Sequence, residues 1–248
     1  MRLNFIFLFM ANFFFFLTGG IFHLFPLHLG SLGATKTYIG IAMGSANVIQ
    51  ILIMFALRNK ADTINKKKLL IFAACGGILV FPLFYFTNHL GLILGLRVLH
   101  GVIIGIGFPI ASALAIDIIP KEKRVSLIGI FGTSGALSNL FGPALAEFIS
   151  GKFHFKYVFF AAGMVAFVWL CFLLLIKNVA PKTVHKEKPA NIRDYKNGII
   201  LAIIFGTMFS TFFAFISDYA RTIRLQPVSV FFVSYTLFLI LLRFIMSR

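Results

Sequence analysis

One short charged segment indicates how this chain folds: Arg58-Asn-Lys-Ala-Asp-Thr-Ile-Asn-Lys-Lys-Lys68. It places five basic residues and one acidic residue between two long apolar stretches. The acidic residue is Asp62. Charge this dense is held in water, since charged side chains are costly in hydrocarbon. The segment is also too short to form a domain. It therefore predicts that the two flanking stretches end at the same face of a membrane.

The composition supports a membrane protein. Hydrophobic residues make up 60% of the chain and charged residues 12%, whereas soluble domains carry about 25% charged residues. A helix needs about 20 apolar residues to cross a bilayer. Eight stretches of about this length recur, and none alternates as a barrel strand does. They are Leu3–His28, Thr37–Leu57, Leu69–Thr87, Leu90–Ile118, Val125–Ser150, Phe155–Ile176, Gly198–Tyr219 and Val228–Ile245. The predicted fold class is an all-α, polytopic membrane protein with about eight transmembrane helices.

The distribution of the basic residues predicts the orientation. The formal net charge is +16, which alone would suggest a nucleic-acid partner. When successive loops are assigned to alternate sides, 17 of the 23 lysines and arginines fall on the side of the N-terminus and five on the other. This bias is typical of cytoplasmic loops. We therefore expect the lipid bilayer and no nucleic acid as a partner, with both chain ends in the cytoplasm.

Two further features bear on organisation. Cys75 and Cys171 lie inside apolar stretches, which indicates neither a disulfide nor a metal site, and no cofactor is predicted. The polar segment Lys177–Asn197 contains Pro181 and Pro189, as expected of a flexible linker. We predict a six-helix bundle over residues 1–176, a cytoplasmic linker over 177–197, and the first two helices of an incomplete second bundle over 198–248.

This layout and the quoted segment resemble the major facilitator superfamily, whose transporters join two six-helix bundles. In that family the loop between helices two and three carries an Asp followed by a basic cluster. Asp62 takes the Asp position and Lys66, Lys67 and Lys68 the basic cluster. Arg58 and Asn65 replace the two glycines of the family pattern. The resemblance implies that Asp62, Lys66 and Lys67 take part in gating.

The fourth apolar stretch contains Arg97, followed by His100 and by glycines at 101, 105 and 107. This run resembles the family's helix four, where the arginine is tied to proton coupling or to contact with an anionic substrate. An arginine does not lose its proton in a protein, so its burial requires an acidic or carbonyl partner. The alternative is that Arg97 snorkels to the outer interface.

The fifth apolar stretch resembles the family's antiporter motif at Gly142-Pro143, although Ala146-Glu147 replaces its trailing pair of glycines. Glu147 is predicted either as a buried, titrating carboxylate or as a residue that faces water at the outer surface. Asp117 and Arg124 bracket the short turn before this stretch. They resemble an acidic-then-arginine pair of the family, which implies a conformational latch.

The first stretch resembles the opening of bacterial drug and metabolite exporters, through Asn12 and the run from His23 to His28. Asn12 either faces a substrate pathway or bonds a neighbouring helix, because polar groups in hydrocarbon need a partner. His23 and His28 are predicted as interface residues rather than proton carriers.

One enzymatic alternative, an intramembrane protease, lacks the general base that its nucleophile would need. Gly132-Thr-Ser134-Gly135 has the pattern of a rhomboid protease nucleophile, which needs a histidine on a later helix. The later histidines, His154 and His185, lie outside the apolar stretches. The chain is therefore predicted not to be an enzyme.

The resemblance predicts a proton-coupled exporter of a small molecule in a bacterial inner membrane, working by alternating access. Asn12, Arg97, His100 and Glu147 would lie on the substrate and proton pathway. The residues expected to act in gating are Asp62, Lys66, Lys67, Asp117, Arg124, Gly142 and Pro143. The alternative is a truncated, transport-inactive membrane fragment, or an interaction module that depends on a second chain for the missing helices.

Overall fold

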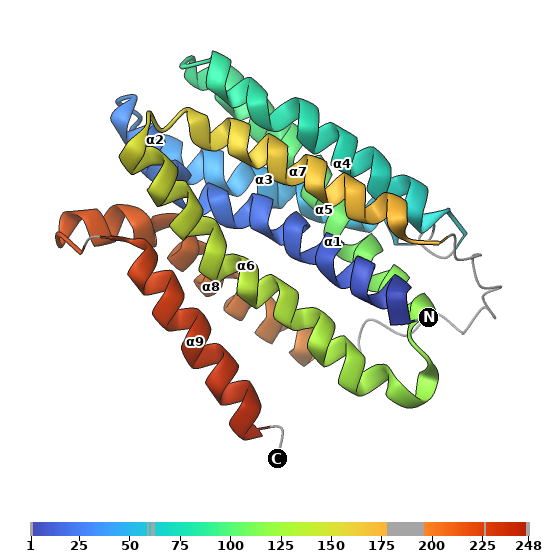
Figure 1. Ribbon diagram of the computed structural model, residues 1–248. Helices are drawn as coiled ribbons and strands as arrows, with labels where there is room; N and C mark the ends of the chain where they lie inside the picture. The colour runs from blue at the N-terminus through green and yellow to red at the C-terminus, as the bar shows by residue number, and fades with distance from the viewer. Residues whose placement is uncertain (1, 59, 61–62, 178–195, 226, 247–248) are drawn as a thin grey trace.

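The computed structural model describes residues 2–58, 60, 63–177, 196–225 and 227–246, and every regular element within them is a helix (Figure 1). The first membrane-crossing segment is built from α1 (Arg2–Ile21), a short 3-10 turn η1 (Phe22–Leu24) and α2 (Phe25–Ser31). Pro26 starts α2, where its missing N–H costs nothing. The predicted all-α membrane fold is therefore confirmed.

Seven further long helices follow, close to the predicted boundaries. They are α3 (Lys36–Leu57), α4 (Lys66–Leu83) with η2 (Phe84–Phe86), α5 (Leu90–Ile118), α6 (Arg124–Lys152) after η3 (Lys121–Lys123), α7 (Tyr157–Leu175), α8 (Lys196–Thr222) and α9 (Ser229–Met246). In the described part of the chain, six helices are long and apolar enough to cross a membrane, and α9 adds a shorter apolar stretch.

Successive helices run in opposite directions, so their turns gather at two ends. The end that holds the N-terminus and the turns near residues 58–65 and 119–123 is called here the basic end (Figure 1). The opposite end, with the turns near residues 32–35, 87–89, 153–156 and 223–228, is called the far end. Asp62 and nearly all of the predicted linker lie outside the described residues, and the predicted division into two bundles stays a prediction.

Side chains start several of the helices by accepting hydrogen bonds from backbone N–H groups that have no partner within the helix. The hydroxyl of Thr35 accepts from the N–H of Tyr38 at 3.2 Å, and Asn65 accepts from the N–H of Lys68 at 3.0 Å. The ring of His89 does the same for the N–H of Leu92 at 3.4 Å. These caps fix where α3, α4 and α5 begin.

Glycines let pairs of helices touch through their backbones. A Cβ on Gly101 of α5 would lie 2.6 Å from the Ala46 carbonyl oxygen of α3. A Cβ on Gly142 of α6 would lie 2.5 Å from the carbonyl carbon of Gly20 in α1. In lipid, the hydrophobic effect does not drive helices together, and close van der Waals packing at small residues stabilises their association instead. Gly142 therefore acts here as a packing residue between α1 and α6.

The close approach of α3 and α5 predicts the outcome of Gly101→Ala. The added methyl must displace the backbone of α3, which costs about 1–3 kcal/mol in the free energy of unfolding. The matched control is Gly95→Ala in the same helix, where a new Cβ meets nothing within 4 Å. Thermal unfolding in detergent should show a lower midpoint for Gly101→Ala and an unchanged one for Gly95→Ala. Equal midpoints would contradict the packing of α3 on α5.

Candidate functional site

Arg97 lies inside the bundle, on the face of α5 that packs against α3. Its Nε donates to the Ala42 carbonyl at 3.0 Å and its Nη2 to the Met43 carbonyl at 3.3 Å. Its guanidinium carbon lies 5.7 Å from the ring centre of Phe22 and 5.6 Å from that of Phe25. The side chain is not snorkelling, because Arg97 is only 4% exposed. The partners are carbonyls, and no carboxylate among the described residues lies within ion-pair distance of Arg97.

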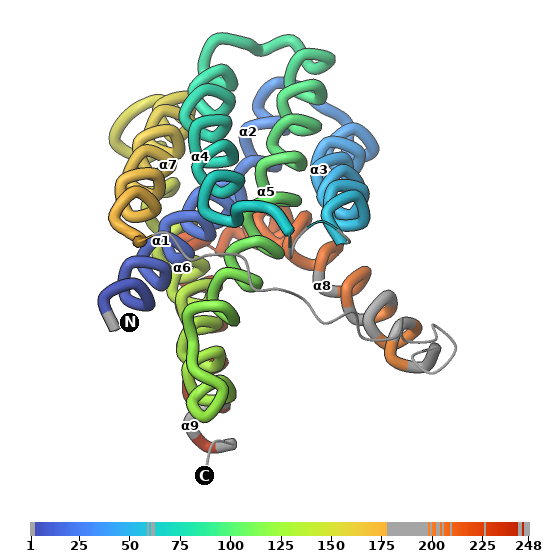
Figure 2. The backbone as a smooth tube through the Cα atoms, turned by 90° about the vertical axis from the view of Figure 1, so that its right-hand side faces the viewer, coloured from blue at the N-terminus to red at the C-terminus, as the bar shows by residue number. Residues whose placement is uncertain are grey.

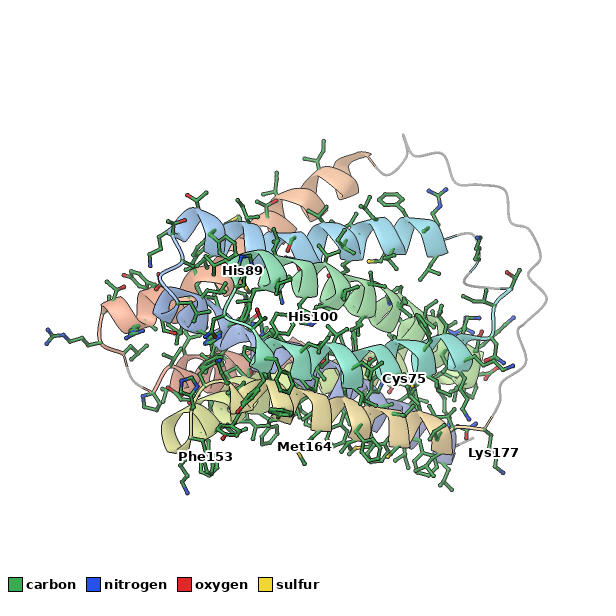
Figure 3. All side chains as sticks on the ribbon, turned by 90° about the horizontal axis from the view of Figure 1, so that it is seen from above. Cys75, His89, His100, Phe153, Met164 and Lys177 are labelled. Atoms are coloured by element: carbon green, nitrogen blue, oxygen red, sulfur yellow. The ribbon has the colours of Figure 1, made fainter. Side chains whose placement is uncertain are left out.

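His100 is tied to Arg97. The Nη1 of Arg97 lies 2.9 Å from Nδ1 of His100, and a guanidinium can only donate, so Nδ1 accepts and the imidazole is neutral. The ring centre lies 4.5 Å from that of Phe22 and 4.9 Å from that of Phe81. Figure 3 shows His100 inside the bundle, nearer to His89 than to Lys177. His100 thus belongs to the packed interior between η1, α4 and α5.

Asn12 joins α1 to α6. Its amide donates to the hydroxyl of Ser134 at 2.7 Å, and that hydroxyl donates to the Phe131 carbonyl at 2.6 Å. Asn12 and Ser134 are both buried. Of the two environments predicted for Asn12, this geometry matches the bond to a neighbouring helix.

Glu147 lies near the far end of α6 and contacts α9. Its Oε1 accepts from the N–H of Val228 at 2.7 Å and its Oε2 from the N–H of Ser229 at 2.9 Å. The carboxylate therefore caps the first turn of α9. The sequence analysis predicted Glu147 as a buried or a water-facing carboxylate, but it did not predict that the start of α9 would be its partner.

Two lysines at the basic end that were predicted to act in gating, Lys66 and Lys67, form contacts with other helices of the first six. Lys66 of α4 forms an ion pair with Asp117 of α5 at 2.8 Å, and both side chains are largely buried. Lys67 donates to the carbonyls of Leu174 and Ile176 at 3.1 and 2.5 Å, at the end of α7. These contacts hold the basic ends of α4, α5 and α7 together.

Asp117 and Arg124, which the resemblance predicted as a conformational latch, do not form an ion pair with each other in this structure. Asp117 pairs with Lys66, while Nη2 of Arg124 lies 3.5 Å from the Ile116 carbonyl, to which it donates. The physical reason is the start of α4, which brings Lys66 against the end of α5.

A second set of contacts joins the first six helices to α8 and α9 near the far end, and it forms what we call the seam. Lys36 at the start of α3 pairs with Asp218 of α8. Asn47 of α3 donates to Ser210 at 3.0 Å. Sequence reasoning missed this pairing of α3 with α8, although the opposite charges at matching ends of the two stretches were a possible signal.

His23 lies at the centre of the seam. Its Nε2 is 3.2 Å from Oδ1 of Asn139, and its ring stacks on Phe232 at 5.1 Å and 15°. Its backbone carbonyl accepts from the hydroxyl of Ser217 at 2.6 Å. The rings of His23 and Phe213 are 5.1 Å apart. His23 thus contacts both α8 and α9, in line with the interface role predicted for it.

The seam ends partway along α8. Every described residue from Gly198 to Phe212 is exposed, although Ser210 in this half bonds Asn47, whereas Phe213 is 6% exposed and Ala220 1%. Figure 2 shows the other half of α8 running away from the six-helix bundle. Val228, which precedes α9, and Phe232 in α9 are buried, but Leu241 and Ile245 are exposed. The two parts of the described structure therefore meet at the far end and separate toward the basic end.

The predicted pathway residues lie in three separate groups of contacts. Arg97 and His100 lie inside the first six helices, Asn12 between α1 and α6, and Glu147 at the seam. Their assignment to a substrate or proton pathway stays a prediction.

The contact between Asn12 and Ser134 predicts a measurable coupling. In a double-mutant cycle of Asn12→Ala and Ser134→Ala, we expect about 0.6 kcal/mol of interaction energy, the usual size for hydrogen bonds between membrane helices. Unfolding in bicelles would measure it. Additive effects of the two changes would rule out the bond between α1 and α6.

The environment of Arg97 predicts that Lys does not replace it. An ammonium cannot reach two carbonyls and an imidazole together, so Arg97→Lys should lower the free energy of unfolding by about 2–3 kcal/mol. His100→Phe, which keeps a ring beside Phe22 and removes one acceptor, should cost less. Chemical unfolding of both variants in bicelles checks this order. A fully stable Arg97→Lys variant would contradict it.

Known structures share this arrangement of helices. The nucleoside transporter NupG superposes with a TM-score of 0.77 at 13% identity, over 99% of this chain and 68% of that one. A bacterial homologue of the human lysosomal transporter Spinster, in an inward-facing and unoccupied conformation, gives a TM-score of 0.72 at 14% identity, over 94% of this chain and 58% of that one.

Sequence relatives agree with the fold. The multidrug resistance protein MdtG of Rahnella sp. is 31% identical over 183 residues, which is 70% of this chain and 43% of the relative. MdtG of Salmonella arizonae is 29% identical over 193 residues, 72% of this chain and 46% of the relative. The chain thus spans less than half the length of these relatives. The sequence model of the Major Facilitator Superfamily matches residues 5–248. The protein is a multi-pass integral membrane protein, and it belongs to the major facilitator superfamily of transporters.

Proposed function

We propose that the chain takes part in the export of a small molecule, driven by protons, by alternating access across a bacterial cytoplasmic membrane. Family membership supports transport, and the relatives named as multidrug resistance proteins support export. Because the chain spans less than half of those relatives, the substrate and the activity of the whole protein belong to this proposal.

The orientation follows from the charges. Among the described residues, most lysines and arginines outside the apolar stretches lie at the basic end, so we place this end in the cytoplasm. The far end then faces outward. With this orientation, the contacts of the seam lie on the outer side, and the exposed half of α8 lies toward the cytoplasm.

The observation that carries the proposal is the change in burial along α8, from exposed residues up to Phe212 to the buried residues Phe213, Ala214, Ser217 and Ala220. Alternating access requires two bodies that contact each other on one side at a time. The pairs Lys66–Asp117 and Lys67–Ile176 support the first six helices as one such body. The seam at His23 is the contact that would open for release to the outside.

Proton coupling is assigned to Arg97 in this proposal. A buried positive charge favours the ionised form of any carboxylate that approaches it. The described structure holds Arg97 on carbonyls, so the carboxylate would arrive in another state of the cycle. Asp62, Asp117, Arg124 and the Gly142-Pro143 bend are proposed to act in gating.

The test is an efflux assay on the 248-residue chain. Bacteria that lack their own drug exporters are loaded with a fluorescent cationic dye, and its loss is followed with and without a protonophore. We expect faster loss than in cells with an empty vector, and no difference once the proton gradient is collapsed. Arg97→Ala should slow proton-driven loss about tenfold or more, as expected when one charge-assisted contact disappears.

Two results would count against the proposal. Dye loss equal to the empty vector, with the chain present in the membrane, would favour the alternative of a partner-dependent module. Recovery of export with a second polypeptide that supplies further helices would then support that alternative. Undiminished export by Arg97→Ala would remove Arg97 from the mechanism.

A further inference from the structure

The first turn of α9 depends on Glu147 for its hydrogen bonds. The first N–H groups of a helix have no partner inside it. Here the N–H groups of Val228 and Ser229 both donate to the Glu147 carboxylate, at 2.7 and 2.9 Å. A negative charge at a helix N-terminus is also stabilised by the helix dipole. Both oxygens of the carboxylate are thus occupied by the backbone of another helix.

These bonds cross the seam. Glu147 belongs to α6, in the first six helices, whereas Ser229 is the first residue of α9 and Val228 directly precedes it. The carboxylate lies one turn beyond Gly142-Pro143, where α6 packs on the backbone of Gly20. Its position is therefore fixed by the packed bundle, and it holds the end of a helix that otherwise leaves that bundle.

The polar contacts that α3 makes with α8 across the seam are weaker than the contact at Glu147. The ion pair of Lys36 and Asp218 is exposed, with side chains 69% and 24% accessible, and exposed pairs contribute little to stability. Asn47 and Ser210 form a neutral bond. Of the seam contacts described above, the one at Glu147 places a charge of one part on N–H groups at the start of a helix of the other.

We propose that Glu147 is the outer latch of the transporter. Its carboxylate clamps the start of α9 to α6 and so keeps the far end closed. This role rests on the proposed alternating access, in which the seam must open. It also explains the residue type, because a carboxylate offers two acceptors whereas an amide offers one acceptor and one donor. Glutamine at this position could bond one of the two N–H groups and would oppose the other.

The direct test is hydrogen exchange of the Val228 and Ser229 amides in the 248-residue chain in nanodiscs, read by mass spectrometry with single-residue fragmentation. In the unchanged chain both amides should exchange slowly. In Glu147→Gln their exchange should accelerate about tenfold or more at the same pH, because a charge-assisted bond is lost. Glu147→Asp, which keeps both acceptors on a shorter side chain, should lie between them and serves as the rescue variant.

A second readout separates a latch from a simple helix cap. Ala214 lies buried on α8 behind the seam, so a cysteine there reports opening from outside. In a chain with Cys75→Ala and Cys171→Ala, Ala214→Cys should react slowly with a membrane-impermeant thiol reagent added outside right-side-out vesicles. Adding Glu147→Gln should speed this reaction several-fold.

The matched control is Asp218→Asn, which removes the neighbouring ion pair and should leave the exchange of Val228 and Ser229 unchanged. Unprotected amides in the original chain, or amides unaffected by Glu147→Gln, would overturn the latch. Faster exchange without faster labelling would also overturn it, because Glu147 would then cap α9 without holding the seam. Neither readout requires transport, so a failed efflux assay leaves this test decisive.

Discussion

A charge or a backbone polar group placed in hydrocarbon must find a partner inside the protein, and this requirement shapes each contact described above. Arg97 meets it with carbonyls of α3 and the ring nitrogen of His100. Lys66 meets it with Asp117. Glu147 meets it with two N–H groups of α9, which solves the same problem for those groups. Each of these contacts joins two helices. The polar groups that need a partner in the membrane therefore also fix how the helices pack.

The connections fall into two kinds. Arg97, Asn12 and Lys66 join helices that also touch through glycines or apolar side chains over much of their length, and their bonds are buried. The contacts of the seam lie near the far end, and the remaining parts of α8 and α9 are largely exposed. Packed interiors resist continuous deformation, so motion is concentrated where packing is sparse. This contrast supports the proposal that the first six helices move as one body and that the seam is the joint.

Much of the fold was predictable from the sequence. Continuous apolar stretches predicted the helices to within a few residues, because in lipid the apolar length itself sets the helix. The resemblance to the major facilitator superfamily is confirmed, and with it the prediction that the chain is not an enzyme. For Arg97 the sequence required an acidic or carbonyl partner, and the structure supplies carbonyls. Such arguments succeed where the chemistry of one residue restricts its surroundings.

The contacts of the candidate site were harder to predict, for a physical reason. Glu147 binds backbone N–H groups about eighty residues away, and a backbone group carries no signature in the sequence. The pairing of Asp117 with Lys66 depends on how α4 begins beside the end of α5, and the sequence alone does not show that these two helix ends meet.

The strength of the seam also follows from its chemistry. To reverse a two-state equilibrium from 1:99 to 99:1, binding or protonation must supply about 5.5 kcal/mol. A seam as extensive as the contact between α3 and α5 would exceed what such a step provides. The described seam consists of one capped helix, one stacked histidine, one exposed ion pair and the bonds of Ser210 and Ser217. In the proposed transport cycle, these few contacts are what substrate or proton binding would have to break, while the packed first six helices stay intact.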